Sequence, residues 1–510
     1  MRVGLERAGR RRSAVRRSDG PWVPWLVAAV AAAVYSTFAV TQWRRLEVPS
    51  WDLGIFTQLA KAYSRLEAPV VTIKGAGFNL LGDHFHPLLV VLGPIYRLFP
   101  SGLTLLIVQA LLLALSAVPL TAVARELLGP RRGAALGVAY AFSWGLQGAV
   151  AVQFHEIALA VPLLALSLAA FLRARWWACA LWAAPLVLVK EDLGLTVAVL
   201  GLVIWWRSIS AGRAAWPRRA LQAVRGDRQA QVGAGLAAWG VVWFVLAIGV
   251  VLPALNPRGT YDYYDRVATE GRTGVLDLLL GALAPAEKWV TVLLLVLAAG
   301  VVGVRSPLVW LWVPTLAWRF VGEVEHYWGW EWHYSAVLMP VAAAALLDAV
   351  AGPPAARRTG RAPVTGPAGS GQLRAPAGRG GWASAAVALA LATTVGMTVT
   401  TPVARLADPV TYQPSPRLDG ARAAVDAVTP GSTVESDIYL MAYLVPRAQV
   451  YWVGNHGNPA PDYLVLDTQG RTWPDVTVTD AAALAESRHP GTTYVLVVDA
   501  DGYQVAERAG

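Results

Sequence analysis

The sequence predicts a polytopic α-helical membrane protein with about eleven membrane-spanning helices and a small α/β domain at its C-terminus. Two observations predict this fold class. Hydrophobic residues make up 55% of the 510 residues and charged residues only 15%, whereas soluble domains carry about a quarter charged residues. The apolar residues also fall in blocks of about 15 to 22, the length that a helix needs to cross a hydrocarbon core of about 30 Å.

The first predicted span, residues 22–41, follows an arginine cluster at residues 10–17. A cleaved signal peptide is the alternative, but the apolar run is too long for one and lacks a clear small-residue cleavage site, so we interpret it as an uncleaved helix. Further spans are predicted at residues 103–124, 133–152, 157–172, 176–189, 193–206, 232–253, 287–304, 307–320, 335–350 and 383–402. For the short blocks at 157–172, 176–189 and 307–320, a re-entrant or shielded segment is the alternative.

The distribution of arginines sets the predicted orientation. With the N-terminus inside, most arginines outside the C-terminal domain fall on cytoplasmic segments, as the positive-inside rule requires. All seven histidines then fall on the outer side, where we expect the chemistry. The predicted regions are a basic cytoplasmic N-terminus at 1–21, a transmembrane region at 22–351 with a long first outer loop at 42–102, a flexible Pro/Gly/Arg-rich cytoplasmic linker at 352–381, and the last span at 382–402.

Residues 403–510 alternate helix-like and strand-like patterns and predict a small extracytoplasmic α/β domain. We expect a helix near 421–428, strands near 449–453, 463–467 and 494–498, and a hairpin turn at Asp501-Gly502 that leads into 503–506. The net charge of +10 forms no continuous basic face with interleaved aromatics, so no nucleic-acid partner is expected. The only cysteine, Cys179, excludes an intramolecular disulfide.

The long outer loop opens with Trp51-Asp52-Leu53-Gly54, which places a carboxylate near the membrane surface soon after the first span. A carboxylate in that position can act as a general base, so Asp52 is the candidate catalytic residue. The alternative is an interfacial helix in which Asp52 is only the N-cap and Trp51 belongs to an aromatic belt.

The same loop contains Asp83, His84 and His86. On an extended segment the two histidines would point to one side and could hold a metal together with Asp83. Because two histidines and one carboxylate are an incomplete ligand set, hydrogen-bonded loop histidines are the favoured alternative.

Two very short outer loops, His155-Glu156 and Lys190-Glu191-Asp192, bring further ionisable groups to the interface. Burying such groups in a membrane is costly, which makes them functional candidates. Lys190 could bind a phosphate while Glu191 or Asp192 keeps it oriented. An equally weighted alternative is that Lys190 only snorkels and pairs with its neighbours.

A third outer loop, residues 323–334, alternates aromatic residues with carboxylates and histidines and includes Glu325, His326, Trp330 and His333. Aromatic rings stack on the C–H faces of sugars and carboxylates accept hydroxyl protons, so we favour a sugar-binding surface over an interfacial aromatic belt. Arg319, just before this loop, is a second candidate for a phosphate contact.

A resemblance rests on these motifs. The order of Trp51-Asp52-Leu53-Gly54-Ile55-Phe56, Asp83-His84-Phe85-His86-Pro87, Phe154-His155-Glu156 and Lys190-Glu191-Asp192 resembles a family of bacterial polytopic membrane proteins of unknown function that is grouped with the GT-C glycosyltransferases. The resemblance implies that Asp52 deprotonates the acceptor hydroxyl. It also implies that Asp83, Glu156, Glu191 and Asp192 bind acceptor, sugar or a divalent ion, and that Lys74, Lys190 or Arg319 holds the lipid phosphate.

The chain lacks the Asp-x-Asp or Asp-Glu pair found near the catalytic aspartate in several GT-C branches, which leaves a divalent cation, or any other cofactor, open. We expect a membrane glycosyltransferase that moves a sugar from a polyprenyl-phosphate donor in the membrane lipid to an extracytoplasmic glycan or protein acceptor. Further substrate contacts are expected from His84, His86, His155, Glu325, His326, Trp330 and His333. The alternatives are a transporter or lipid flippase, and a non-catalytic membrane anchor of a cell-envelope binding domain.

Overall fold

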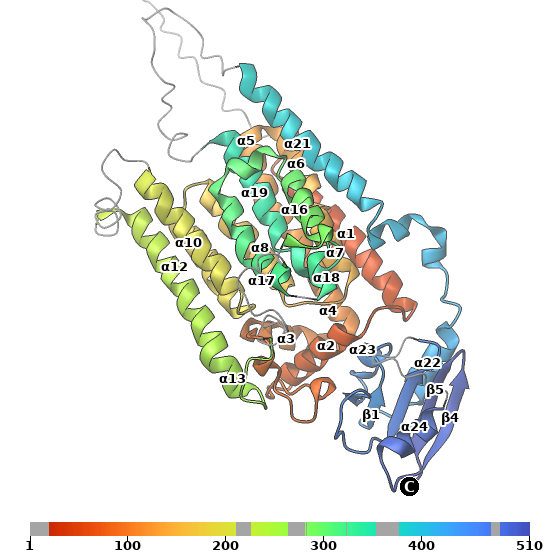
Figure 1. The fold of residues 1–510 in the computed structure, drawn as a ribbon. Coiled ribbons are helices and arrows are strands. Elements are labelled where there is room, and N and C mark those ends of the chain that lie inside the picture. The colour runs from red at the N-terminus through yellow and green to blue at the C-terminus, as the bar shows by residue number, and fades with distance from the viewer. Residues whose placement is uncertain are drawn as a thin grey trace, which may run out of the picture.

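The structure is a computed structural model that describes residues 20–210, 226–263, 281, 283–322, 324–352, 377–470 and 480–510. Helices form most of the described chain up to Thr398, and a five-stranded sheet lies near the C-terminus (Figure 1). The predicted fold class, a helical membrane region followed by a small α/β unit, is therefore confirmed. Glu323, in the third outer loop, lies outside the described residues.

The helical part contains helices of very different lengths. Its α-helices are α1 (Val23–Arg44), α2 (Trp51–Ser64), α3 (Leu92–Leu98), α4 (Gly102–Leu115), α5 (Ala117–Leu128), α6 (Pro130–Ala141), α7 (Trp144–Ala151), α8 (Ile157–Leu172), α9 (Trp176–Ala183), α10 (Leu193–Ser210), α12 (Arg228–Leu246), α13 (Leu252–Leu255), α16 (Ala286–Ala298), α17 (Val313–Val321), α18 (Glu325–Trp328), α19 (Leu338–Ala351) and α21 (Ala377–Thr398). Single-turn and irregular helices are η1 (Thr72–Lys74), η2 (Leu80–Gly82), η3 (Pro87–Val91), η4 (Ala184–Leu188), η5 (Ala247–Val251), η6 (Val302–Arg305), η7 (Pro307–Trp312), η8 (His333–Ser335), η9 (Pro402–Ala407) and η10 (Pro409–Tyr412).

Five described helical segments are long and apolar enough to cross a membrane, and the bent pair α18–η8 with α19 would make a sixth. The predicted count of about eleven is thus not confirmed, because several predicted spans are shorter or broken. The block at 307–320, for example, is η7 followed by α17, with a proline at the start of each. The five are Val23–Arg44, Gly102–Leu128, Pro130–Ala151, Arg228–Leu255 and Gly381–Thr398.

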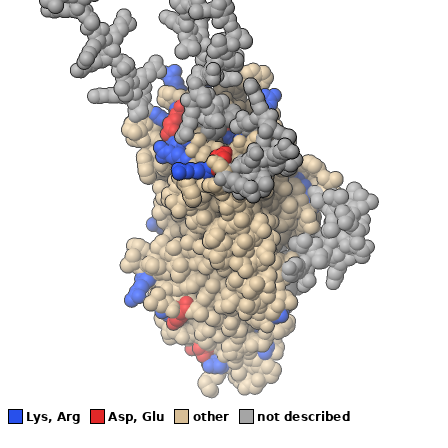
Figure 2. Space-filling model, turned by 90° about the vertical axis from the view of Figure 1, so that its left-hand side faces the viewer, with Lys and Arg blue, Asp and Glu red and all other residues tan. Residues whose placement is uncertain are grey.

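The ends of the helical part carry most of its visible charge. Figure 2 shows the face formed in part by α10 and α12, where lysine, arginine and acidic side chains gather toward the upper and lower ends and the broad middle is largely free of them. In Figure 1, α2, α3 and the sheet lie at the lower end, whereas α10 ends and α21 begins at the upper end. The two predicted sets of loops are therefore at opposite ends; which end faces the cytoplasm stays a prediction.

Helices α10 and α12 approach each other more closely than any side chain beyond glycine would permit. A Cβ added at Gly240 would lie 2.3 Å from the carbonyl oxygen of Gly194, and one at Gly201 would lie 2.4 Å from the backbone nitrogen of Ala237. Small residues serve this purpose in membrane helices, where close backbone packing replaces the hydrophobic effect as the source of association.

We expect Gly240→Leu to lower the stability of the protein by at least about 1 to 3 kcal/mol, because the new side chain must push α12 away from α10. Gly235→Leu is the matched control, since a Cβ at this position of the same helix meets nothing within 4 Å. Thermal unfolding in detergent checks this: a lower Tm for Gly240→Leu alone supports the packing, and equal Tm values for the two variants contradict it.

The C-terminal part is a mixed sheet with the strand order β2-β1-β3-β5-β4. Strand β1 pairs in parallel with β2 and β3, while β5 pairs antiparallel with β3 and β4. The predicted helix, three strands and hairpin are confirmed, the last by positive φ angles at Asp501 and Gly502. The elements are α22 (Leu418–Ala427), β1 (Thr433–Ser436), α23 (Met441–Leu444), β2 (Gln449–Trp452), β3 (Tyr463–Asp467), α24 (Ala481–Arg488), β4 (Tyr494–Ala500) and β5 (Tyr503–Arg508).

The first outer loop and the C-terminal domain share one hydrophobic core. Leu53, Leu59 and Ile73 from the loop pack with Met441 and Val450 from the domain. The loop predicted as a long exposed segment is therefore folded, with α2, η1, η2, η3 and α3 inside it.

Side chains of the same loop donate hydrogen bonds to backbone carbonyl groups at and beside the edge strand β2. Gln58 Nε2 donates to the Val450 carbonyl at 2.8 Å, and Thr72 Oγ1 donates to the same oxygen at 2.6 Å. Lys61 Nζ donates to the carbonyl of Ala448 at 3.1 Å. The domain therefore fixes the position of α2, the helix that carries Asp52.

Candidate functional site

Asp52 lies in the first turn of α2, but it is not the N-cap, which is Ser50. The alternative interpretation of Asp52 as a capping residue is therefore wrong. One carboxylate oxygen, Oδ2, is 3.3 Å from Nε2 of His155, and 32% of the Asp52 side chain is exposed. The ring of His155 stacks on that of His333, with 3.4 Å between the centroids. Asp52 is thus an accessible carboxylate backed by two buried imidazoles.

Two glutamines hold the loop before α8 against the start of α2. Gln153, at a positive φ of 64°, accepts from the Leu53 backbone nitrogen at 2.9 Å. Gln109 donates to the Gln153 carbonyl at 2.7 Å and accepts from the His155 backbone nitrogen at 3.0 Å. Neither glutamine was predicted as a site residue, although Gln109 is a polar residue inside an apolar block, which is a signal of function.

Lys190 and Glu156 form a buried ion pair between two separate loops, with 2.8 Å between Nζ and Oε1. Burial alone would lower the pKa of Lys190, but Glu156, Asp192 and Glu191 outweigh it and hold the pKa well above its ordinary value. Burial would raise the pKa of Glu156, and the facing Lys190, His84 and His155 instead hold it well below its usual range. Both groups therefore remain charged at neutral pH, and the pairing that the alternative for Lys190 expects is present, with Glu156 as the partner.

Glu191 accepts three hydrogen bonds from the outer loop and a later segment. His84 Nδ1 donates to its Oε1 at 2.7 Å, the Phe85 backbone nitrogen to its Oε2 at 3.0 Å, and the Tyr261 hydroxyl to its Oε1 at 3.3 Å. Burial opposes ionisation of Glu191, but His84 and Lys190 overcome it and lower the pKa to about 2. Burial by itself would lower the pKa of His84. The charge of the nearby Glu191 carboxylate and its hydrogen bond oppose this effect, and the pKa of His84 is raised above its ordinary value.

Asp192 is in a different environment from its neighbour. Its Oδ2 accepts from Nε1 of Trp318 at 3.0 Å. Burial raises the pKa of Asp192 to about 6, with Glu191 adding to the rise and Lys190 opposing it. Asp192 therefore changes its charge closer to neutral pH than Glu156 or Glu191 does.

Asp83 pairs with Lys74, at 3.1 Å between Oδ2 and Nζ, and accepts a long 3.4 Å hydrogen bond from the Tyr263 hydroxyl. Tyr263 also stacks on His84, with 4.5 Å between the ring centroids. His86 is buried, which lowers its pKa to about 4, and it packs edge-on against Phe56. His84 and His86 thus have different neighbours: His84 is hydrogen-bonded, as the alternative of loop histidines expects, whereas the buried Nδ1 of His86 has no hydrogen-bond partner among the described residues.

Arg319, in α17, is fully buried and donates to the segment that follows this helix. Its Nε donates to the Tyr327 carbonyl and its Nη2 to the Gly329 carbonyl, both at 2.7 Å, and its Nη1 donates to Ser335 Oγ at 3.1 Å. These bonds hold the loop that carries His333. Because three of its guanidinium N–H groups are bound in this way, we do not propose Arg319 as a phosphate contact.

The other three candidates of the loop at 323–334 are more exposed than His333 and have different neighbours. Glu325 and His326 are exposed, and His326 packs on Trp332 with 5.1 Å between ring centroids. Trp330 is half-buried against the helical core. Of the predicted sugar-binding residues of this loop, His333 is the one that stacks directly on the group around Asp52.

The predicted site residues other than Arg319, Glu325, His326 and Trp330 form one connected group, which we call the outer polar cluster. Tyr334 lies within electrostatic reach of Asp52, Glu156 and Lys190 alike, and His84 influences Asp83, Glu156 and Glu191. Among the described residues, no group of three or more His, Cys, Asp or Glu side chains is arranged to hold a metal ion. The cluster consists of Asp52, Lys74, Asp83, His84, His86, His155, Glu156, Lys190, Glu191, Asp192 and His333.

Comparison with known proteins agrees with the fold. The sequence profile of a family described as predicted membrane protein (DUF2079) matches residues 42–505. No curated protein sequence matches this chain significantly. Among solved structures, ArnT from Cupriavidus metallidurans bound to undecaprenyl phosphate is similar at a TM-score of 0.53 and 16% identity, over 96% of this chain and 98% of that one.

An oligosaccharyltransferase from Archaeoglobus fulgidus is also similar, at a TM-score of 0.40 and 13% identity, over 93% of this chain and 73% of that one. At 16% identity, the likeness to ArnT bears on the fold alone. The fold is therefore similar to that of ArnT, and the family match agrees with a membrane protein.

Proposed function

Because the chain belongs to the DUF2079 family of predicted membrane proteins and has a GT-C-like fold, we propose that it is a membrane glycosyltransferase. In this proposal a sugar passes from a polyprenyl-phosphate donor to a hydroxyl group of an extracytoplasmic glycan or protein. One observation carries the proposal: an accessible carboxylate, Asp52, and a buried cation, Lys190, belong to one cluster assembled from segments far apart in the sequence.

Asp52 takes the proton from the acceptor hydroxyl in the proposed reaction. The acceptor oxygen then forms a bond to the anomeric carbon as the bond from that carbon to the phosphate oxygen breaks. His155 lies on the side of Asp52 that contacts the protein, which leaves the exposed part of the carboxylate for the acceptor.

Lys190 stabilises the departing lipid phosphate by its charge. An ammonium group has three donors, and Glu156 accepts only one of them in the ion pair. A phosphate ester leaves without protonation when charge is stabilised, so a base and a cation supply what the reaction needs. Lys74 is a second cation of the cluster, although it is already paired with Asp83.

A transfer assay tests the proposal. The full-length protein is reconstituted in lipid vesicles that contain undecaprenyl phosphate carrying a radiolabelled sugar, and loss of label from the lipid is followed with and without a cell-envelope extract as acceptor source. We expect extract-dependent loss of label and its appearance in a water-soluble or protein fraction. Intact donor that merely changes leaflet would favour a flippase, and intact donor that stays in place would favour a non-catalytic anchor.

A further inference from the structure

Two tryptophans meet at the junction between α2 and the C-terminal sheet. Trp51, which directly precedes Asp52, contacts Trp452 at the end of β2, with 4.8 Å between ring centroids and a nearly perpendicular arrangement. Both side chains are half-buried. Because Trp51 and Asp52 are the first two residues of α2, the aromatic pair lies within one helical turn of the candidate base, and the C-terminal domain contributes one of its rings.

The turn after β2 is shaped around Trp452. A Cβ on Gly454 would lie 2.3 Å from the indole ring of Trp452, so only glycine permits the ring to lie there. The Trp452 carbonyl accepts from Nδ2 of Asn458 at 2.9 Å. Nδ2 of Asn455 donates to the Ile73 carbonyl at 3.0 Å and ties the same turn to the outer loop.

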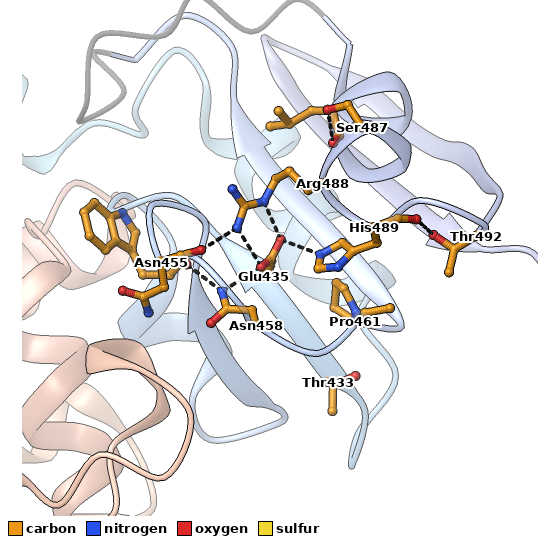
Figure 3. A network of polar contacts seen from close by, with 12 residues as sticks. Thr433, Glu435, Asn455, Asn458, Pro461, Ser487, Arg488, His489 and Thr492 are labelled. Atoms are coloured by element: carbon orange, nitrogen blue, oxygen red, sulfur yellow. Dashed lines mark hydrogen bonds and ion pairs between the residues drawn. The ribbon is translucent and has the colours of Figure 1, made fainter. Parts of the chain in front are cut away.

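A buried carboxylate stabilises this turn from inside the sheet. Glu435 is fully buried and accepts from Asn458 at 2.6 Å, from Arg488 Nε at 3.1 Å, and lies 3.2 Å from Nε2 of His489. Figure 3 shows Asn458, Arg488 and His489 arranged around Glu435, with Arg488 also reaching the backbone of Asn455. A buried charge is costly unless it is fully paired, so the network holds the turn, and with it Trp452, in one geometry.

The position of the pair restricts what it can meet. The sheet lies beyond the lower end of the helical part, beside α2 (Figure 1). A lipid donor approaches from the helices, so a molecule that reaches the tryptophans from the side of the sheet comes from water. Indole rings bind the apolar C–H face of a pyranose while its hydroxyl groups stay hydrated or hydrogen-bonded.

We infer that Trp51 and Trp452 form an acceptor subsite for a pyranose ring, so that the acceptor is a carbohydrate and the C-terminal domain takes part in its recognition. This inference rests on the proposed function, since it places the acceptor next to Asp52. The chemistry favours a glycan over a peptide acceptor, and peptide binding is an outcome of the test.

Saccharide binding by the full-length protein in lipid nanodiscs tests the subsite. Binding of neutral hexose and N-acetylhexosamine disaccharides is followed by saturation-transfer NMR without donor lipid, with an uncharged hexapeptide as the comparison ligand. We expect Trp452→Ala to raise the disaccharide Kd about ten-fold and Trp452→Phe to raise it less. Trp382→Ala, which removes an exposed tryptophan in the first half of α21, should leave the Kd unchanged.

The inference is overturned if the wild-type protein binds the hexapeptide but no disaccharide, or if disaccharide binding is the same in Trp452→Ala. If Trp452→Ala lowers the Tm, the disaccharide Kd of Trp452→Phe is compared with the wild-type Kd instead, because this variant keeps an aromatic ring in the junction. Because no donor is present, the outcome is independent of transfer. If disaccharides bind through Trp452 but no sugar is transferred, only the proposed function is contradicted. If sugar is transferred but disaccharide binding does not depend on Trp452, only the subsite is contradicted.

Discussion

Asp52→Asn should reduce sugar transfer by a factor of about 10² to 10⁴, the range that a general base contributes. The amide cannot accept the acceptor proton, yet it keeps the size of the carboxylate. Since about a third of the Asp52 side chain is exposed and its contact with His155 is 3.3 Å long, the substitution should cost little stability. Initial rates in the vesicle assay, normalised to the amount of folded protein, measure the effect.

Asp419→Asn serves as the control for this variant. Asp419 is an exposed aspartate in α22 whose side chain is 95% exposed, so its substitution should change neither Tm nor transfer. An Asp52→Asn protein that transfers at the wild-type rate would remove Asp52 from the mechanism and leave the outer polar cluster without a base.

Lys190→Met should abolish transfer and also destabilise the protein by about 3 to 5 kcal/mol, because Glu156 is then a buried carboxylate without its cation. The two effects must be separated, since an unfolded protein is inactive for trivial reasons. Loss of Tm and loss of transfer are therefore measured on the same preparation.

The double variant Lys190→Met with Glu156→Gln makes that separation. Removing both charges of a buried pair is often close to neutral for stability, so the double variant should recover most of the Tm. It should nonetheless fail to transfer sugar, because the cation proposed to stabilise the departing lipid phosphate is gone. Recovery of transfer together with Tm would mean that Lys190 has a structural role only.

The C-terminal domain cannot be assigned a role by deleting it. Its residues Met441 and Val450 are part of the core around Leu53 and Leu59, and its edge strand binds Gln58 and Thr72. Removal would expose that core and release α2, so an anchor and an enzyme would both lose function. Point substitutions at the tryptophan pair are the informative change.

The sequence carried enough information for the fold class because membrane helices and alternating strands leave periodic apolar patterns. It was insufficient for the span count, because the apolar length of a block such as 307–320 does not show that the chain there forms two short helices, although the prolines at their starts are visible. Strand β1 was missed because Glu435 at its centre argues against a buried strand. Its compensating partners, Arg488 and His489, lie far along the chain.

The candidate site was predictable as a set of residues but not as a set of pairs. Short loops with several charges indicated His155, Glu156 and Lys190, whereas the pairing of Lys190 with Glu156 depends on how the helices pack. Tyr261 and Tyr263 lie between predicted spans and carried no signal, although both contact carboxylates of the cluster. Sequence thus identified which groups are costly to bury, and the tertiary fold decides what neutralises them.

A structure of the full-length protein in lipid nanodiscs with bound undecaprenyl phosphate is the most direct test of the central claim, that Asp52 and Lys190 serve one site for a lipid-linked donor. We predict that the phosphate lies within hydrogen-bonding distance of Lys190 Nζ, with Asp52 facing the same cavity. A phosphate held elsewhere, with Lys190 still enclosed by Glu156 and Asp52 opening onto a different surface, would contradict the account.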